Sequence, residues 1–76
     1  MGKPTRITNS IRALRFARGE MTQAELAQRI GVTRQTIIAI EQGRYSPSLE
    51  VAFQIARVLK VPLDEVFQYP DGEGGL

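Results

Sequence analysis

The segment from Thr22 to Gln42 constrains the fold most strongly, because it contains two helix starts with a helix stop between them. Thr22–Glu25 reads as a capping box, in which the threonine hydroxyl accepts from the Glu25 amide and the carboxylate reaches back. Gly31 follows the apolar stripe of this helix and permits the left-handed backbone that ends it. Thr33 then caps a second helix. The sequence therefore predicts two short helices that are joined by a turn of three residues.

Another helix is predicted before this pair. Thr8 or Asn9 can cap it, and apolar residues at helical spacing continue to about Ala17.

Two more helices are predicted after the pair. The fourth runs from Pro47 to about Leu59, since Ser46 is a favoured cap and proline suits the first helical position. Its apolar side chains lie nearly all round the helix, so it is either central in the fold or has a second partner. Pro62 opens a short fifth helix that ends at about Val66. The fold class expected is an all-α domain of five short helices.

Length and composition exclude several classes of protein. The 76 residues allow one domain, which we assign to residues 1–69, with 70–76 as a flexible tail. Because the chain has neither Cys nor His, we expect no disulfide, no metal, no cofactor and no enzyme activity. No apolar run reaches the ~18 residues of a membrane span, and the N-terminus has no signal peptide. We expect a cytoplasmic protein without a membrane partner or a small-molecule ligand.

The charge is distributed unevenly along the chain. As far as Arg44 there are eight basic and three acidic residues, which gives a net charge of +5. The remainder has two basic and five acidic residues, a net charge of −3. Most of the basic residues are arginine, which suits bidentate contacts to phosphate and guanine. A polyanion is therefore a candidate partner for the first part, and solvated surface charge is the alternative.

The second helix of the central pair carries side chains that can read DNA bases. A unit of this spacing can lay its second helix in a major groove, about 12 Å wide, while its first helix crosses the backbone. Arg34 can donate two hydrogen bonds to guanine, and Gln35 can pair with adenine. Thr36 and Ala39 are small enough to contact a thymine methyl group. The alternative is an ordinary solvated helix face.

Residues around the pair suit contacts to phosphate. Gln23 and the free amides of its helix can bind a phosphate at the helix N-terminus. Thr33 and Arg44 flank the second helix and suit the same role. Thr22 is a cap first and a phosphate ligand second, and Tyr45 either contacts a phosphate or closes its loop.

Two stretches carry a recognisable pattern, TQAELAQRIGVTRQTI at residues 22–37 and IEQGRYSPSL at residues 40–49. They resemble the phage Cro/repressor (Xre-like) family of helix-turn-helix regulators, and the likeness extends over about residues 11–67. The resemblance implies a five-helix domain that binds double-stranded DNA at a near-palindromic operator as a homodimer. It also implies transcriptional regulation, most simply as a repressor. By this likeness the base-facing or groove-edge residues are Gln23, Arg34, Gln35 and Ala39, and those near phosphates are Thr33, Thr36 and Arg44.

Structural roles are expected for four further residues. Ala27 is small where the two central helices cross, and Gly31 takes the left-handed turn. Family members often pair an arginine of the first helix with the glutamate after the recognition helix, which here implies Arg15 and Glu41. Between Arg15 and Thr22 the chain has one residue more than the commonest spacing, so the partner of Glu41 stays open. Capping of surface charge is the alternative for Glu41.

The resemblance to a compact bacterial subgroup implies a small antiparallel ribbon between residues around 4–8 and 67–69. A domain this small cannot bury all its apolar residues, so we expect a dimer. The expected interface consists of Leu63, Val66, Phe67 and Tyr69.

Two other classes of protein remain as alternatives. The scaffold could serve as a protein-interaction module such as an antitoxin, with the acidic part after Arg44 as its partner face. Few residues follow Tyr69, which is little for an extension that wraps a toxin. An enzyme comes third, because the serines have no histidine base and Asp64 and Glu65 have no metal set around them.

Overall fold

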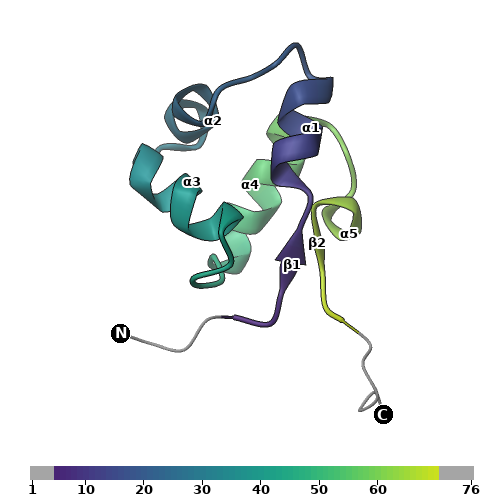
Figure 1. The fold of residues 1–76 in the computed structure, drawn as a ribbon. Coiled ribbons are helices and arrows are strands. Elements are labelled where there is room, and N and C mark those ends of the chain that lie inside the picture. The colour runs from purple at the N-terminus through teal and green to yellow at the C-terminus, as the bar shows by residue number, and fades with distance from the viewer. Residues whose placement is uncertain (1–4, 71–76) are drawn as a thin grey trace.

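The computed structural model describes residues 5–70, and this part of the chain contains five helices and two short strands (Figure 1). The elements follow in the order β1 (Thr8–Asn9), α1 (Ile11–Ala17), α2 (Gln23–Ile30), α3 (Arg34–Glu41), α4 (Leu49–Leu59), α5 (Leu63–Val66) and β2 (Phe67–Gln68). The predicted fold class, a five-helix domain with a small ribbon, is confirmed. The tail predicted over 70–76 lies outside the described residues from 71 onwards.

The start signals of α2 and α3 act as the sequence predicts. Thr22 Oγ1 accepts from the Glu25 amide at 3.0 Å, while Glu25 Oε1 accepts from the Thr22 amide at 2.9 Å. Thr33 Oγ1 accepts from the Thr36 amide at 3.1 Å. Gly31 between the two helices has φ +78°, in the left-handed region. Local capping therefore sets the bounds of the turn that joins α2 to α3.

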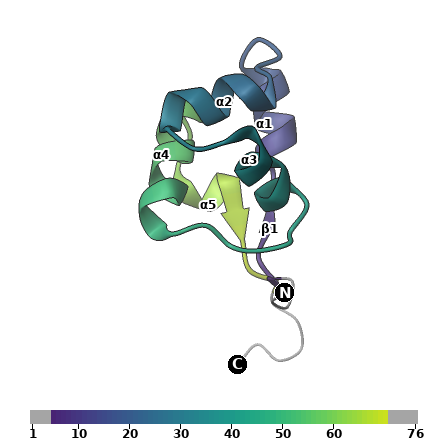
Figure 2. The same ribbon diagram turned by 90° about the vertical axis from the view of Figure 1, so that its left-hand side faces the viewer.

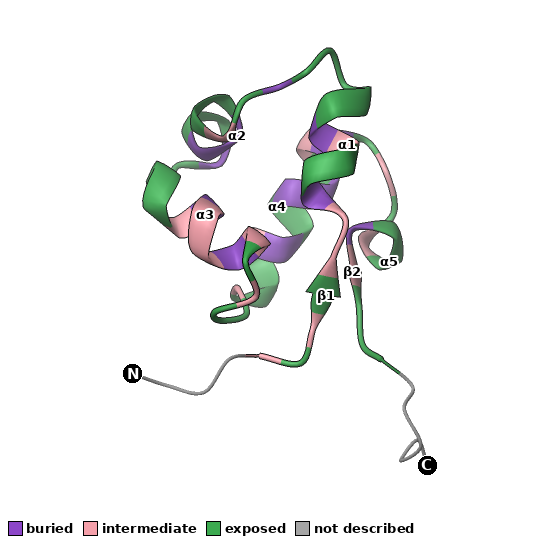
Figure 3. Ribbon diagram, in the orientation of Figure 1, coloured by how far each residue is buried: buried purple, intermediate pink, exposed green. Residues whose placement is uncertain are grey.

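Every helix contributes to a single core. Figure 3 shows the buried residues on the faces that the helices turn toward one another. The fully buried large side chains are Ile11, Leu26, Ile37, Ile40, Ile55, Leu59 and Val66. Burial of each of these side chains stabilises the folded state by about 1.5–3 kcal/mol. Ala27 is also buried and packs in this core, as expected for a small residue between α2 and α3.

The beginning of α1 differs from the prediction. Thr8 and Asn9 form β1, and the N-cap position belongs to Ser10, whose side chain makes no capping hydrogen bond. Asn9 still serves the helix start, because its Oδ1 accepts from the Ile11 amide at 3.2 Å. Its Nδ2 donates to the Ile40 carbonyl at 3.0 Å. Asn9 therefore joins the start of α1 to the end of α3, a tertiary contact that no local pattern predicts.

Helix α4 begins two residues later than expected. Ser48, not Ser46, is the N-cap, and its Oγ accepts from the Val51 amide at 3.2 Å. Two serines flank Pro47, and either is a favoured cap, although Pro47 favoured Ser46 by sequence. The later start leaves residues 43–47 as the connection between the last cap of α3 and the first cap of α4. Helix α5 is shifted likewise, because Pro62 is its N-cap rather than its first residue.

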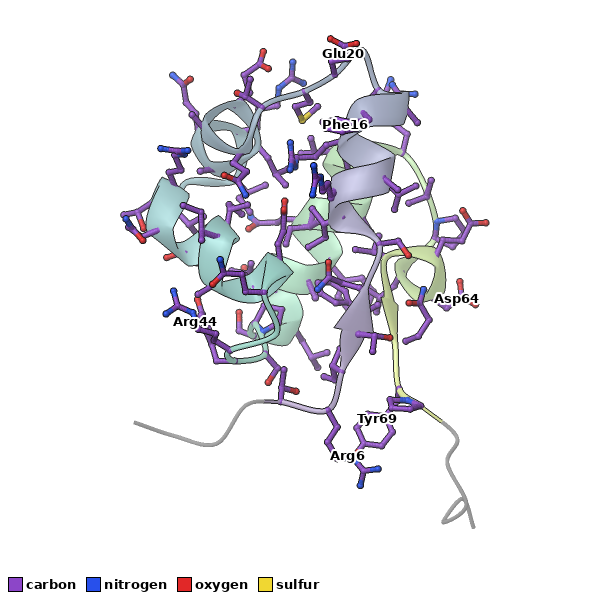
Figure 4. All side chains as sticks on the ribbon, in the orientation of Figure 1. Arg6, Phe16, Glu20, Arg44, Asp64 and Tyr69 are labelled. Carbon is purple, nitrogen blue, oxygen red and sulfur yellow. The ribbon has the colours of Figure 1, made fainter. Side chains whose placement is uncertain are left out.

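The ribbon joins the two ends of the described chain (Figure 1). Thr8 pairs with Gln68 and Asn9 with Phe67 in antiparallel register. The predicted ribbon is therefore present but shifted along the chain; of its expected range 4–8, residue 4 lies outside the described residues. Tyr69 lies beyond the strand, and the Arg6 guanidinium is 5.8 Å from the centre of its ring. Figure 4 shows these two side chains next to each other at the open end of the ribbon.

The turn between α1 and α2 spans residues 18–22. Two consecutive residues have left-handed backbone there, Gly19 with φ +77° and Glu20 with φ +59°. Because a left-handed conformation suits glycine, only Glu20 carries strain. The Arg15 side chain holds the end of this turn, since its Nη1 donates to the Met21 carbonyl at 2.7 Å. None of the helices described is long and apolar enough to cross a membrane.

Replacing Gly31 with alanine is expected to lower the free energy of unfolding by about 1 kcal/mol. A Cβ atom at this position would meet nothing within 4 Å, so the cost arises from the left-handed backbone and not from a clash. Gly31→Asn should lose less, because asparagine tolerates this conformation better. Urea unfolding of the three proteins measures the difference. A Gly31→Ala variant as stable as the unsubstituted protein would contradict this account.

Candidate nucleic-acid interface

Helix α3 turns one side to the core and the other to solvent. Ile37 and Ile40 are at most 2% exposed and fix the inward side. Arg34 and Gln35, in the first turn, are exposed. In Figure 2, α2 and α3 face the viewer and nothing covers them. The predicted base-reading residues at the start of α3 are therefore free to meet a ligand.

The other predicted contact residues of α3 are less exposed to solvent. Thr36 and Ala39 are half-buried. The Thr36 hydroxyl is 3.0 Å from that of Thr33, so both hydroxyls take part in the cap of the helix. Ile38, on the same helix, is half-buried as well. Because the side chains of Thr36 and Ala39 are small, a ligand can approach the helix backbone closely at these positions.

A buried ion pair ties α1 to the end of α3. Arg15 Nε donates to Glu41 Oε2 at 2.7 Å and Nη2 donates to Glu41 Oε1 at 3.1 Å. The two side chains are only 7% and 9% exposed. Arg15 is thus the arginine of α1 that meets Glu41. The bidentate arrangement fixes geometry as well as charge.

Gln23 extends this pair to the start of α2. Its Nε2 donates to Glu41 Oε1 at 3.2 Å. A side-chain amide nitrogen carries two hydrogens, so one remains to donate to a ligand. The three side chains form a network of Arg15, Gln23 and Glu41 that holds the N-terminus of α2 against the end of α3. Sequence reasoning placed Gln23 at the ligand but did not find its link to Glu41.

A concave surface encloses a volume of about 1310 Å³ between α1, the start of α2 and the two ends of α3. Three arginines (Arg12, Arg15 and Arg34) and two glutamates (Glu20 and Glu41) line it, and Arg15 is paired with Glu41. The Arg12 guanidinium is 5.6 Å from the centre of the Phe16 ring, which is 52% exposed; Figure 4 labels this ring on α1. With three arginines against two glutamates, the lining keeps a net positive charge of +1.

Sequence reasoning did not single out Arg12 as a candidate contact. Its spacing of three residues from Arg15 puts both on one side of α1. That spacing was the available signal. No group of three or more acidic side chains lies close enough to hold a metal ion among residues 5–70.

The loop after α3 carries two more predicted phosphate contacts. Arg44 is exposed, and its backbone amide donates to the Ala39 carbonyl at 3.0 Å. Figure 4 shows its side chain pointing outward beside α3. Tyr45 is 42% exposed. The loop thus keeps Arg44 next to the exposed side of α3.

The predicted dimer residues divide into two groups. Val66 is fully buried within one chain, so it cannot contact a partner, and this prediction is wrong. Helix α5 has a single turn, and Val66 is the residue that this turn inserts into the core. Leu63 and Phe67 are half-buried, and Tyr69 is 63% exposed. These three keep apolar surface that a partner could cover.

Known proteins resemble both the sequence and the fold. A family model described as helix-turn-helix matches residues 11–66. An HTH-type transcriptional regulator of Methanocaldococcus jannaschii is 53% identical over 53 residues, which cover 70% of this chain and 80% of that protein. The transcriptional repressor RstR of the cryptic phage CTXphi in Vibrio cholerae is 39% identical over 59 residues, 78% of this chain and 52% of that protein.

A solved structure extends the comparison. The restriction-modification controller protein C.AhdI from Aeromonas hydrophila superimposes with a TM-score of 0.66 at 31% identity. The match covers 72% of this chain and 78% of that one. Both kinds of likeness span most of the chain.

Proposed function

The chain belongs to the helix-turn-helix family of DNA-binding transcriptional regulators, and on this premise we propose that it is a sequence-specific repressor. It binds a near-palindromic operator in double-stranded DNA as a homodimer. Helix α3 enters the major groove and α2 crosses the phosphate backbone. Occupancy of a promoter is the simplest way for such a domain to act, and its similarity to the repressor RstR supports this direction.

One observation carries the proposal: α3 exposes Arg34 and Gln35 in its first turn while its opposite side is sealed in the core. Residues at the N-terminal end of a recognition helix are those that reach base edges. Arg34 donates to guanine O6 and N7, and Gln35 pairs with adenine. Ala39, one turn further along, contacts a thymine methyl group.

The network of Arg15, Gln23 and Glu41 sets the register of this contact. Gln23 lies at the start of α2, where backbone amides are free to bind a phosphate. Since Glu41 links Gln23 to the end of α3, a phosphate bound at α2 fixes the position of α3 in the groove. Gln23 itself reaches the groove edge with its second amide hydrogen. Phosphate contacts thus orient the residues that read bases.

Further phosphate contacts surround the recognition helix. Arg44 is exposed beside α3 and neutralises one phosphate, and the exposed Tyr45 hydroxyl donates to another. Thr22, Thr33 and Thr36 lie at helix starts, where a hydroxyl engaged in capping still reaches a phosphate oxygen. Arg12 extends this basic surface onto α1, since it lines the same concave surface as Arg34.

Selection of bound sequences from a random DNA pool, with the mass of the complex measured in parallel, tests the proposal. The expected result is an inverted repeat whose half-sites are centred 10–10.5 base pairs apart, about 34 Å, bound by two chains. A pool without enrichment at low salt would contradict sequence-specific recognition. A single unrepeated site bound by one chain would contradict the homodimer.

A further inference from the structure

Helix α4 has an outward side that no other element of the described chain covers. Ala52 and Ile55 turn into the core, whereas Leu49 is 72% and Phe53 is 56% exposed. Large apolar side chains this exposed are costly in so small a domain, which can bury only about 60% of its unfolded surface. The helix therefore has apolar side chains with nothing to pack against in one chain.

This exposed side continues onto α5 and the ribbon. One hollow of about 480 Å³ lies between Leu49, Leu63 and Phe67. A second, of about 610 Å³, lies between Phe53, Arg57 and Leu63. Because Leu63 lines both, the two hollows form one surface, which we call the α4–α5 face.

Two opposite charges lie on this face at matched positions. Glu50 and Arg57 are both exposed and border the second hollow. Within residues 5–70 neither of them takes part in an ion pair, since the single salt bridge there joins Arg15 to Glu41. They are two helical turns apart, so both point to the same side of α4. The midpoint between them falls between Phe53 and Gln54.

This arrangement is self-complementary. If a second α4 lies antiparallel beside the first, with a twofold axis at the midpoint, each Glu50 meets an arginine and each Arg57 meets a glutamate. Interfaces of this isologous kind use the same patch on both subunits. The two Phe53 rings then pack near the axis and leave water.

We propose that a second copy of this chain occupies the α4–α5 face, with antiparallel α4 helices and Glu50 paired with Arg57 of the partner subunit. This rests on the homodimer of the proposed function and gives that homodimer its interface. A different protein would not require a charge pattern that is symmetric about the point between Phe53 and Gln54, whereas a second copy does.

The position of α4 agrees with the way the dimer meets DNA. In Figure 2, α2 and α3 face the viewer while α4 lies along one margin of the molecule. A twofold axis parallel to the line of sight, placed beside that margin, makes the two α4 helices antiparallel. The same axis leaves both α3 helices on the same side, where one DNA duplex can reach them.

Charge reversal tests the pairing. Glu50→Arg places like charges opposite each other, so the dissociation constant of the dimer should rise by about 10-fold or more. Arg57→Glu should do the same, and the double variant Glu50→Arg/Arg57→Glu should restore dimerisation. Glu20→Arg is the matched control, because it makes the same charge change on the exposed turn between α1 and α2 (Figure 4). Sedimentation equilibrium measures association, and circular dichroism checks that each variant is folded.

Each outcome decides between the interface and the proposed function. A folded Glu50→Arg variant that dimerises as the unsubstituted protein does would overturn this interface, while that dimer could still select an operator. Failure of the double variant to restore association would overturn the pairing of Glu50 with Arg57. If the unsubstituted protein stays monomeric in solution and on DNA, both the interface and the homodimer are wrong, and sequence-specific binding is judged separately by the pool selection.

Discussion

Replacing Glu41 with alanine should lower the free energy of unfolding by about 3–5 kcal/mol, because it leaves a buried arginine charge without its partner. Arg15 and Glu41 are both less than 10% exposed, and two hydrogen bonds join them. Without Glu41, the Arg15 guanidinium keeps its bond to the Met21 carbonyl, which does not neutralise the charge. Gln23 loses a partner as well. Since small domains are stable by about 5–15 kcal/mol, much of the protein's stability would be lost.

Urea unfolding followed by circular dichroism measures this loss, with two controls. Glu65→Ala removes an exposed carboxylate and should change stability by no more than about 0.5 kcal/mol. The double variant Arg15→Met/Glu41→Leu removes both charges and fills the space with apolar groups, so it should recover most of the stability. A loss below about 1 kcal/mol for Glu41→Ala would contradict the buried-pair account.

Replacing Arg34 with alanine should weaken binding to the preferred operator by about 1–3 kcal/mol and relax the preference at one base pair. The side chain is exposed at the start of α3, so its removal should leave the fold intact and delete the two hydrogen bonds that we propose it makes to a base edge. The loss should be larger for the selected operator than for unrelated DNA, because base contacts are absent from nonspecific complexes.

Arg44→Ala is the matched control for Arg34→Ala, since it removes the same charge from an exposed residue beside α3. It should weaken binding to all sequences alike and lower the slope of log K against log salt by about one. Titrations over a range of salt concentrations, together with pool selection for both variants, distinguish the two roles. An unchanged consensus for Arg34→Ala would show that this arginine does not read a base.

The predictions for the central helix pair, which depend on neighbouring residues in the sequence, succeeded. Thr22 and Thr33 cap their helices, and Gly31 takes the left-handed turn, because each interaction joins residues no more than a few positions apart. Where two local signals competed, the outcome depended on the whole fold. Pro47 favoured Ser46 as the cap by sequence, yet α4 begins after Ser48.

Predictions that depend on tertiary position were less successful. Val66 is as apolar as an interface residue should be, yet α5 inserts it into the core. The apolar content of α4 indicated either a central helix or a second partner, but only the packing of Ala52 and Ile55 identifies Phe53 as an outward residue. Likewise, the pattern placed Gln23 at the DNA, while its bond to Glu41 depends on how α2 and α3 pack.

The ribbon has a consequence for the order in which the chain folds. Its paired residues, Thr8 and Gln68, are 60 positions apart, and closing so long a loop costs conformational entropy before any contact is gained. Helices α2 and α3 are adjacent along the chain and need no such closure. We therefore expect the helix pair to form early and the ribbon to close last. Its amides should exchange with solvent sooner than those of Ile37 or Ile55, through local openings that leave the recognition helix in place.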